Sequence, residues 1–222
     1  MAPNTKTRDA ERTRAEILQA ALEEFAAHGF GASTIRGIAS RIDVSHGLIR
    51  HYYKSKESLW FAAVDFLFER LRQQVQMTYE DRKAIEKGDM DIFRDWLRSY
   101  VYYCARHPEH ARIMIQESVS PNDRLKYVVR EYVQQAHEDT LSLIDRMRAN
   151  GDIVATGSSV SLIYIITGAC QNIFALAAEA DYSLGYDALT PEAIENHAEM
   201  VISVFCGAPV KDTPPVSKRE KT

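Results

Sequence analysis

The sequence has few of the residues and motifs from which enzymes and metal-binding proteins build their sites. It has three cysteines among 222 residues, Cys104, Cys170 and Cys206, and they form no CxxC pair. An odd and widely spaced set argues against a disulfide framework or a structural zinc site, and it fits a reducing compartment. The Gly-rich phosphate loop, the GxSxG motif and the HExxH motif are also missing. We therefore expect no enzyme, no metal and no cofactor.

Proline is scarce as well, because only Pro108, Pro121 and Pro191 lie between the two terminal segments. Ser120 and Thr190 precede two of them, and an N-cap residue followed by proline is a typical helix start. No window of alternating β-branched residues competes with the helical spacing. We predict an all-α protein with helices near residues 55–79, 89–106, 108–119, 121–149, 157–180 and 190–206.

Charge is missing from residues 153–178. A membrane span needs roughly 20 apolar residues, but Ser, Thr, Gln and Asn interrupt this run and no basic cluster flanks it. We interpret it as a helix buried on all sides, partly against a second copy of the chain. Its small residues and an apolar seam in the last helix predict a four-helix dimer interface, although a monomeric core stays open. The predicted interface residues are Ser161, Gly168, Ala175, Ile194, Ala198, Val201 and Phe205.

The net charge of −4 is unevenly distributed. Residues 1–56 hold nine Lys/Arg against six Asp/Glu, whereas residues 57–222 hold eighteen against twenty-five. A basic N-terminal part followed by an acidic remainder favours a protein whose N-terminal part binds phosphate groups. The N-terminus lacks the apolar core of a secretion signal, so we expect a cytoplasmic protein without a membrane partner. Residues 1–8 are predicted to form a flexible arm, and residues 208–222 a disordered tail.

Two short helical patterns separated by a tight junction occupy the stretch from Thr34 to Leu59. Thr34 and Ser45 are suited to be the N-caps of the first and second helix. Asp43 falls where the chain must turn, and Asp tolerates a left-handed backbone better than most residues. A longer helix before them is predicted to end with Gly29 in a left-handed cap. The pattern is typical of a helix-turn-helix, which places its second helix in the DNA major groove.

The second short helix and the residues after it carry the polar and basic groups of a DNA-reading element. Arg50 is suited to guanine and, with Ser45 and His46, is a candidate for reading base edges. Gly47 costs about 1 kcal/mol against Ala inside a helix, which indicates a functional or packing reason. The predicted phosphate contacts are Thr34, Tyr53, Lys54 and Lys56. The full predicted DNA-binding set is Thr34, Arg36, Ser45, His46, Gly47, Leu48, Arg50, His51, Tyr53, Lys54 and Lys56.

Large aromatic side chains gather between residues 92 and 132. A helical core explains most of them, but a ligand pocket lined by aromatics uses the same composition. Cys104, His107 and His110 lie nearby, yet Pro108 breaks the helical register between them, so recognisable metal-ligand spacing is missing. The candidate effector-pocket residues are Trp96, Tyr100, Tyr103, Met114, Glu117, Tyr127 and Asn172.

Residues 17–60 resemble the DNA-binding domain of TetR-family transcriptional regulators. The chain departs from the usual family pattern in three places: Ile42-Asp43 stands where Ala-Gly is usual, Arg50 where Tyr is common, and Tyr53 where Phe is usual. The residues that match the pattern are Gly29, Phe30, Thr34, Ile38, Ala39, Val44, Ser45, Gly47, Tyr52, Ser55, Lys56, Glu57 and Leu59.

The resemblance implies an all-α homodimer with two working parts. A three-helix head, residues 9–54, would bind a palindromic DNA operator, and a helical domain, residues 55–207, would dimerise and bind a small-molecule effector. The function it implies is a repressor that the effector releases from DNA. Two alternatives stay open: a ligand or metal sensor that acts through protein contacts, and a transcriptional activator.

Overall fold

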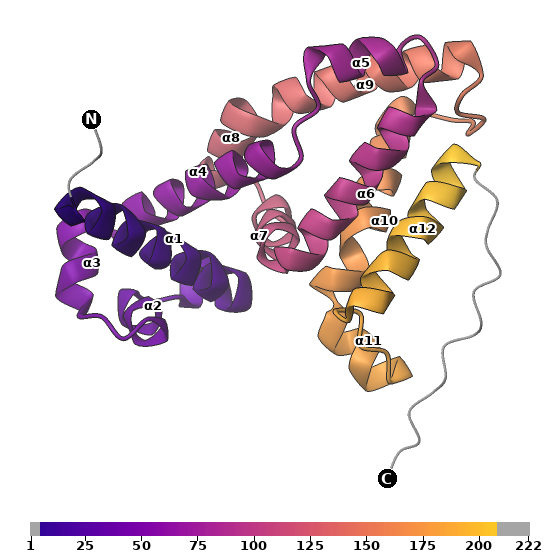
Figure 1. The fold of residues 1–222 in the computed structure, drawn as a ribbon. Coiled ribbons are helices and arrows are strands. Elements are labelled where there is room, and N and C mark those ends of the chain that lie inside the picture. The colour runs from indigo at the N-terminus through magenta and orange to yellow at the C-terminus, as the bar shows by residue number, and fades with distance from the viewer. Residues whose placement is uncertain (1–4, 208–222) are drawn as a thin grey trace. The chain divides into compact units, whose positions relative to one another are not determined.

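The computed structural model describes residues 5–207, and the regular structure in that range is entirely helical (Figure 1). The chain forms two compact units. The first comprises the residues up to Arg70 and a returning segment, residues 112–128; the second comprises residues 71–111 and the chain from Val129 onward. The predicted tail, residues 208–222, lies outside the described residues, as do the first four residues of the predicted arm.

Several local signals of the first unit are found where they were predicted, since Thr34 and Ser45 cap the second and third helices with their side-chain oxygens. Asp43 turns the chain between those two helices with φ 52°. The first helix begins at Thr5, ahead of the start expected near Asp9.

Two further predictions for the first unit are corrected. Gly29 has φ 71° and ψ 163°, so it kinks the first helix and does not form a left-handed cap. The helix predicted from Pro121 begins at Asp123. The helices are α1 (Thr5–Ala32), α2 (Ile35–Arg41), α3 (His46–Tyr52), α4 (Lys56–Gln74), α7 (Pro108–Ser118) and α8 (Asp123–Val128), of which α4 and α7 cross the unit boundary.

A buried carboxylate joins α1 to α2. Glu24 is only 8% exposed, and its Oε2 accepts a hydrogen bond from Arg41 Nε at 2.8 Å. Its Oε1 lies where Gly37 would carry a side chain, because a Cβ built on Gly37 is 2.4 Å from that oxygen. A side chain at position 37 would therefore require the Glu24 carboxylate to move.

The helices of the second unit break where no proline or glycine marks the break. The helix predicted over 55–79 ends at Gln74, and Thr78 caps a separate helix. The helix predicted over 157–180 bends at Leu176, and the one over 121–149 contains a π-helical turn, Val129–Val133. The α-helices are α5 (Tyr79–Ile85), α6 (Met90–Arg106), α9 (Gln134–Asn150), α10 (Ser159–Ala175), α11 (Ala177–Leu184) and α12 (Pro191–Cys206).

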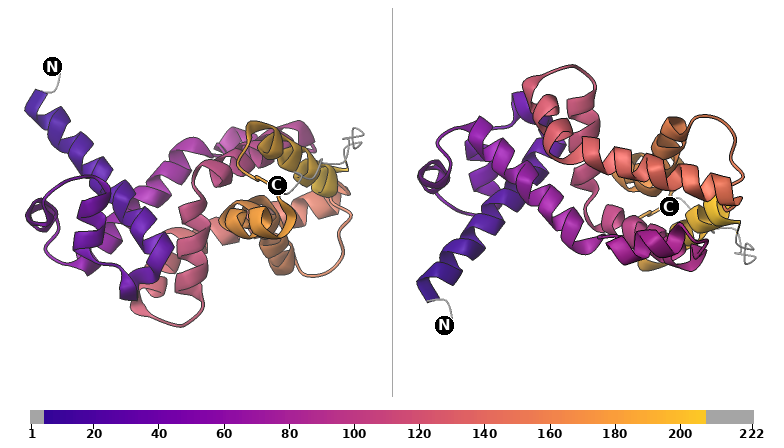
Figure 2. Two further views of the ribbon diagram at one scale, coloured as in Figure 1. Left: turned by 90° about the horizontal axis from the view of Figure 1, so that it is seen from below. Right: turned by 90° about the horizontal axis from the view of Figure 1, so that it is seen from above.

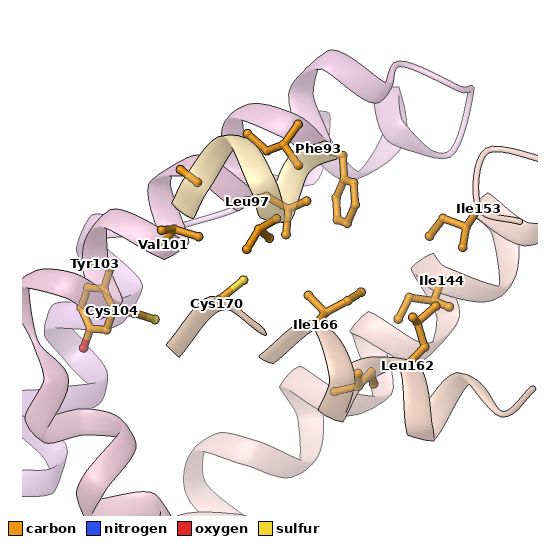
Figure 3. Close-up of a cluster of buried hydrophobic side chains, with 14 of the residues drawn as sticks. Phe93, Leu97, Val101, Tyr103, Cys104, Ile144, Ile153, Leu162, Ile166 and Cys170 are labelled. Carbon is orange, nitrogen blue, oxygen red and sulfur yellow. The ribbon is translucent and has the colours of Figure 1, made fainter. Parts of the chain in front are cut away.

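The core of the second unit forms where α6 meets α10 and α12 (Figure 1). Leu97 and Val101 on α6 point towards Ile166 and Cys170 on α10, and the apolar side chains from α9 and the following loop complete the cluster (Figure 3). Burial raises the pKa of Cys170 to about 12, so its thiol stays protonated and serves as packing.

Two expectations about the dimer interface are corrected by this core. Ala198 and Val201 are 0% and 3% exposed inside the chain, and Ala175 is also buried, so none of the three is available to a partner. Ile194 and Phe205 pack partly against the same core. The uncharged helix is not buried on all sides either, because Tyr164 and Ile165 are largely exposed. Ala175, Ala198 and Val201 were wrongly assigned because close packing within one chain requires the same residues. Ser161 is exposed and Gly168 is half-buried, so the prediction for these two stays open.

Within the described range, no single helix has the length and apolarity to cross a membrane; only the bent pair α10 and α11, at 67°, meets the criterion when joined.

The Glu24 contact predicts an unusual result for Gly37→Ala. In a helix this change normally stabilises by about 1 kcal/mol. Here the new methyl group displaces the Glu24 carboxylate, so we expect the free energy of unfolding to fall by about 1–3 kcal/mol in denaturant titration. Gly31→Ala is the control, because no described heavy atom lies within 4 Å of a Cβ there. A rise in stability for Gly37→Ala would show that Glu24 is not fixed.

Candidate nucleic-acid interface

The α2–α3 turn presents α3 with its polar side outward. Ser45 Oγ accepts a hydrogen bond from Leu48 N at 3.2 Å, and Val44 N donates to Ala39 O at 3.2 Å. Ile49 is the α3 side chain that enters the core with 0% exposure. One apolar residue therefore fixes the rotation of α3 and leaves most of its other side chains facing water.

The exposed residues include most of the predicted DNA-binding set. His46, Gly47, Arg50 and His51 are exposed on α3, as are Thr34, Arg36, Ser45 and Lys54 around it, while Leu48 is half-buried. A surface hollow of about 390 Å³ is lined by Ser33, Thr34, Ile35, Arg36, His46, Arg50 and Lys56. A second, of about 480 Å³, is lined by Arg36, Ala39, Ser40, Asp43, Val44, Ser45 and His46. Arg36 and His46 border both hollows, so the basic and hydrogen-bonding groups of α2 and α3 share one concave face.

Lys56 has a different place from the one predicted. Its Nζ donates to Phe30 O at 2.6 Å, Ser33 O at 3.0 Å and Gly31 O at 3.3 Å. An ammonium has three protons, and here each faces a backbone carbonyl. The prediction of a phosphate contact at Lys56 is therefore corrected: this side chain holds the residues that join α1 to α2, which we call the α1–α2 corner (residues 29–34).

Arg14 was not among the residues predicted from the sequence to bind DNA. Its guanidinium lies 5.4 Å from the centre of the Tyr52 ring, next to Tyr53 at the end of α3. Burial raises the pKa of Tyr53, while the charge of Arg14 acts to lower it. The Tyr53 hydroxyl thus keeps its proton and is a hydrogen-bond donor suited to a phosphate oxygen. The basic run Arg8, Arg12, Arg14 was the available signal.

The predicted effector-pocket residues are divided between the two units. Met114, Glu117 and Tyr127 belong to the first unit and the other four to the second. The Tyr127 hydroxyl donates to Asp65 Oδ1 at 2.7 Å, and the Glu117 carboxylate pairs with an arginine of α8, so both are engaged within the first unit.

The four residues in the second unit are explained by packing and exposure. Trp96 Nε1 donates to Val75 O at 3.2 Å, and its ring stacks on that of Tyr100 at 5.5 Å. Burial raises the pKa of Tyr100 well above its ordinary value, with the adjacent cysteines adding to the effect. The Tyr103 hydroxyl lies 3.0 Å from His110 Nδ1, and Asn172 is exposed.

The cysteine and histidines around Pro108 are likewise used in packing. Cys104 is buried, which raises the pKa of its thiol far above the ordinary value. His107 Nδ1 lies 3.5 Å from Glu109 Oε1. Over residues 5–207, no group of three or more His, Cys, Asp or Glu side chains is arranged to hold a metal ion.

Comparison with known proteins also identifies the helix-turn-helix. Residues 17–63 match the family model described as bacterial regulatory proteins, tetR family. The chain is 30% identical over 112 residues to the HTH-type transcriptional repressor SCO4008 of Streptomyces coelicolor, covering 50% of this chain and 53% of that protein. It is 27% identical over 172 residues to the HTH-type transcriptional regulator BetI 1 of Chromohalobacter salexigens, covering 66% and 82%.

The fold of the whole chain also has relatives among solved structures. A mutant of the protein HlyIIR, in which residues 169–186 are replaced by a linker, superposes with a TM-score of 0.65 at 18% identity, covering 90% of this chain and 100% of that one. This likeness concerns the fold alone. The chain spans about half of the length of SCO4008.

Gly47→Ala tests whether Gly47 is required for DNA binding or for packing within the fold. The nearest described atom to a Cβ at Gly47 is Ser45 Oγ at 3.9 Å, so an alanine fits without strain. We expect the free energy of unfolding to rise by about 0.5–1 kcal/mol, because alanine is the better helix former. We expect DNA affinity to fall at the same time, since the methyl group holds the helix backbone away from the groove. Denaturant titration and gel-shift titration measure the two effects, and unchanged DNA affinity would remove Gly47 from the interface.

Proposed function

We propose that the chain, whose residues 17–63 match the tetR family of bacterial regulatory proteins, is a sequence-specific transcriptional repressor released from a palindromic operator by a small-molecule effector. The observation that carries the proposal is the outward face of α3. It exposes His46, Gly47 and Arg50 beside the hollows of the helix-turn-helix. Groups of this kind, on one short helix behind a tight turn, are suited to the edges of base pairs.

The contacts with DNA divide into two kinds. Arg50 and His46 are proposed to read base edges, with Arg50 suited to the two acceptors of guanine. Lys54, Arg36 and Tyr53 are proposed to contact phosphates, which fix the register but carry no sequence information. Arg14 on α1 joins the second group, because it lies beside Tyr52 and Tyr53.

A palindromic operator calls for a two-fold pair of subunits with α3 helices roughly 34 Å apart. Exposed apolar side chains on the last long helices of the second unit support a self-complementary interface. On α10, Val160, Tyr164 and Ile165 are more than half exposed, and on α12 so are Met200 and Val204. These replace the buried residues Ala198 and Val201 as the proposed contacts, since a homodimer buries the apolar side chains that a single chain leaves in water.

The effector is proposed to act through α4, which begins in the first unit at Lys56 and ends at Gln74 in the second. Binding in the second unit that favours a different tilt of α4 would change the spacing of the two α3 helices. A coupling free energy of about 1–3 kcal/mol is the usual scale of such allostery.

Arg50→Ala and Lys54→Ala test the division of DNA contacts. We expect Arg50→Ala to lower affinity for the selected operator by about 1–3 kcal/mol while leaving competitor DNA almost unaffected. Lys54→Ala should weaken binding to both and reduce the slope of log K against log salt by about 0.9. Gel-shift titration at several salt concentrations measures both, with Lys83→Ala on α5 as control.

Two results would contradict the proposal. If the unmodified protein showed no preference for any sequence over competitor DNA, and no loss of affinity with rising salt, it would not be a DNA-binding regulator. Tight ligand or metal binding in that same protein would then favour a sensor that acts through protein contacts.

The interface is tested by placing a charge on its proposed centre. Ile165 is 58% exposed, so Ile165→Lys leaves the fold of a single chain unstrained. In a dimer the lysine would be buried without a partner, which costs several kcal/mol. We expect sedimentation to show monomers for this variant and dimers for Val154→Lys, whose parent side chain is 91% exposed in a loop. Dimers in both variants would place the interface elsewhere.

A further inference from the structure

The segment of residues 112–128 follows the main helix of the second unit in sequence, yet it packs with the first unit. Gln116 Nε2 donates to Ala26 O in the last turn of α1 at 3.0 Å. The Tyr127 ring meets Phe61 of α4 edge-on at 4.7 Å. Both views in Figure 2 show this segment beside the C-terminal end of α1. The segment therefore contacts both α1 and α4, through residues that lie 90 and 66 positions further along the chain than their partners.

Arg124 makes the most specific of these contacts. Its guanidinium carbon lies 4.0 Å from the centre of the Phe30 ring and 5.6 Å from that of Trp60. Its Nε donates to both carboxylate oxygens of Glu117 at 3.1 Å, and Glu117 is 6% exposed. The paired charges fix the guanidinium over the ring, because moving it would leave a buried carboxylate without its counter-charge.

A second cation, the Lys56 ammonium, also lies over the Phe30 ring. Lys56 Nζ lies 4.5 Å from the centre of the same ring while it donates to the carbonyls of Phe30, Gly31 and Ser33. Those carbonyls come immediately before Thr34, whose side chain accepts from Gly37 N at 2.9 Å and starts α2. The Phe30 ring therefore lies against the lysine that binds the carbonyls preceding α2.

We propose that Arg124, held by Glu117, is a positioning residue for DNA binding: it fixes Phe30 and Lys56, and through them the α1–α2 corner and the helix-turn-helix. The inference rests on the proposed DNA-binding function. It makes the DNA-binding domain discontinuous in sequence, with residues 112–128 as its second part.

Arg124→Met is the informative variant, because it keeps the apolar length of the side chain and removes the charge. We expect affinity for the selected operator to fall about tenfold, the scale of a lost desolvated cation–π contact. The slope of log K against log salt should stay unchanged, because no phosphate contact is lost. Amide hydrogen exchange of residues 30–37 should accelerate, while that of α6 stays as it was. Arg130→Met is the matched control, since the Arg130 side chain is 73% exposed and pairs with its neighbour Glu131.

A double-mutant cycle with Phe30→Leu distinguishes positioning from general stability. If Arg124 acts through the ring, Arg124→Met adds little to the affinity loss of Phe30→Leu; independent effects would add. Both variants are measured at a temperature at which circular dichroism shows them folded. Unchanged affinity and exchange in Arg124→Met, additive losses, or a reduced salt slope would each overturn the proposal. If the unmodified protein selects no DNA sequence, the proposed function fails, and unchanged exchange at residues 30–37 is then the separate result that overturns the role of Arg124.

Discussion

Three backbone carbonyls and one lysine meet at the α1–α2 corner, and the helix-turn-helix depends on that meeting. A helix end leaves carbonyls without partners, and the turn after Gly29 points those of Phe30, Gly31 and Ser33 towards one place. The Lys56 ammonium satisfies all three from the first residue of α4. Since α2 starts at the next residue, its direction is set by the first turn of α4. A shift of the first turn of α4 would therefore displace the corner that precedes α2.

The two sides of α12 in the second unit have different surroundings. The Ala198 side of α12 packs in the core, and Arg98 of α6 ties Glu195 and Glu199 to it at 2.5 and 2.7 Å. This polar network joins α12 to α6 along the edge of the core. The other side of α12 exposes Met200 and Val204.

The sequence predicts well those features whose cause is local. Thr34, Ser45 and Asp43 act within a few residues of themselves, so their capping and turning roles could be identified and are found in the structure. Partners distant in sequence could not be identified, because nothing near Lys56 or Glu24 indicates which carbonyl or arginine it will meet. The seam around Ala198 was placed on the wrong surface for a related reason: small residues at helical spacing indicate close packing, but not whether the neighbour is the same chain or another.

The contact between Glu24 and Gly37 also constrains how this domain can change over generations. A side chain at position 37 meets the Glu24 carboxylate, while loss of Glu24 leaves the Arg41 guanidinium without its buried partner. The two positions therefore form an epistatic pair, in which a substitution tolerated with one partner is harmful with the other. Relatives with a larger residue at position 37 are expected to carry a shorter or apolar residue at position 24, and hybrid domains that exchange α2 without α1 would inherit the conflict.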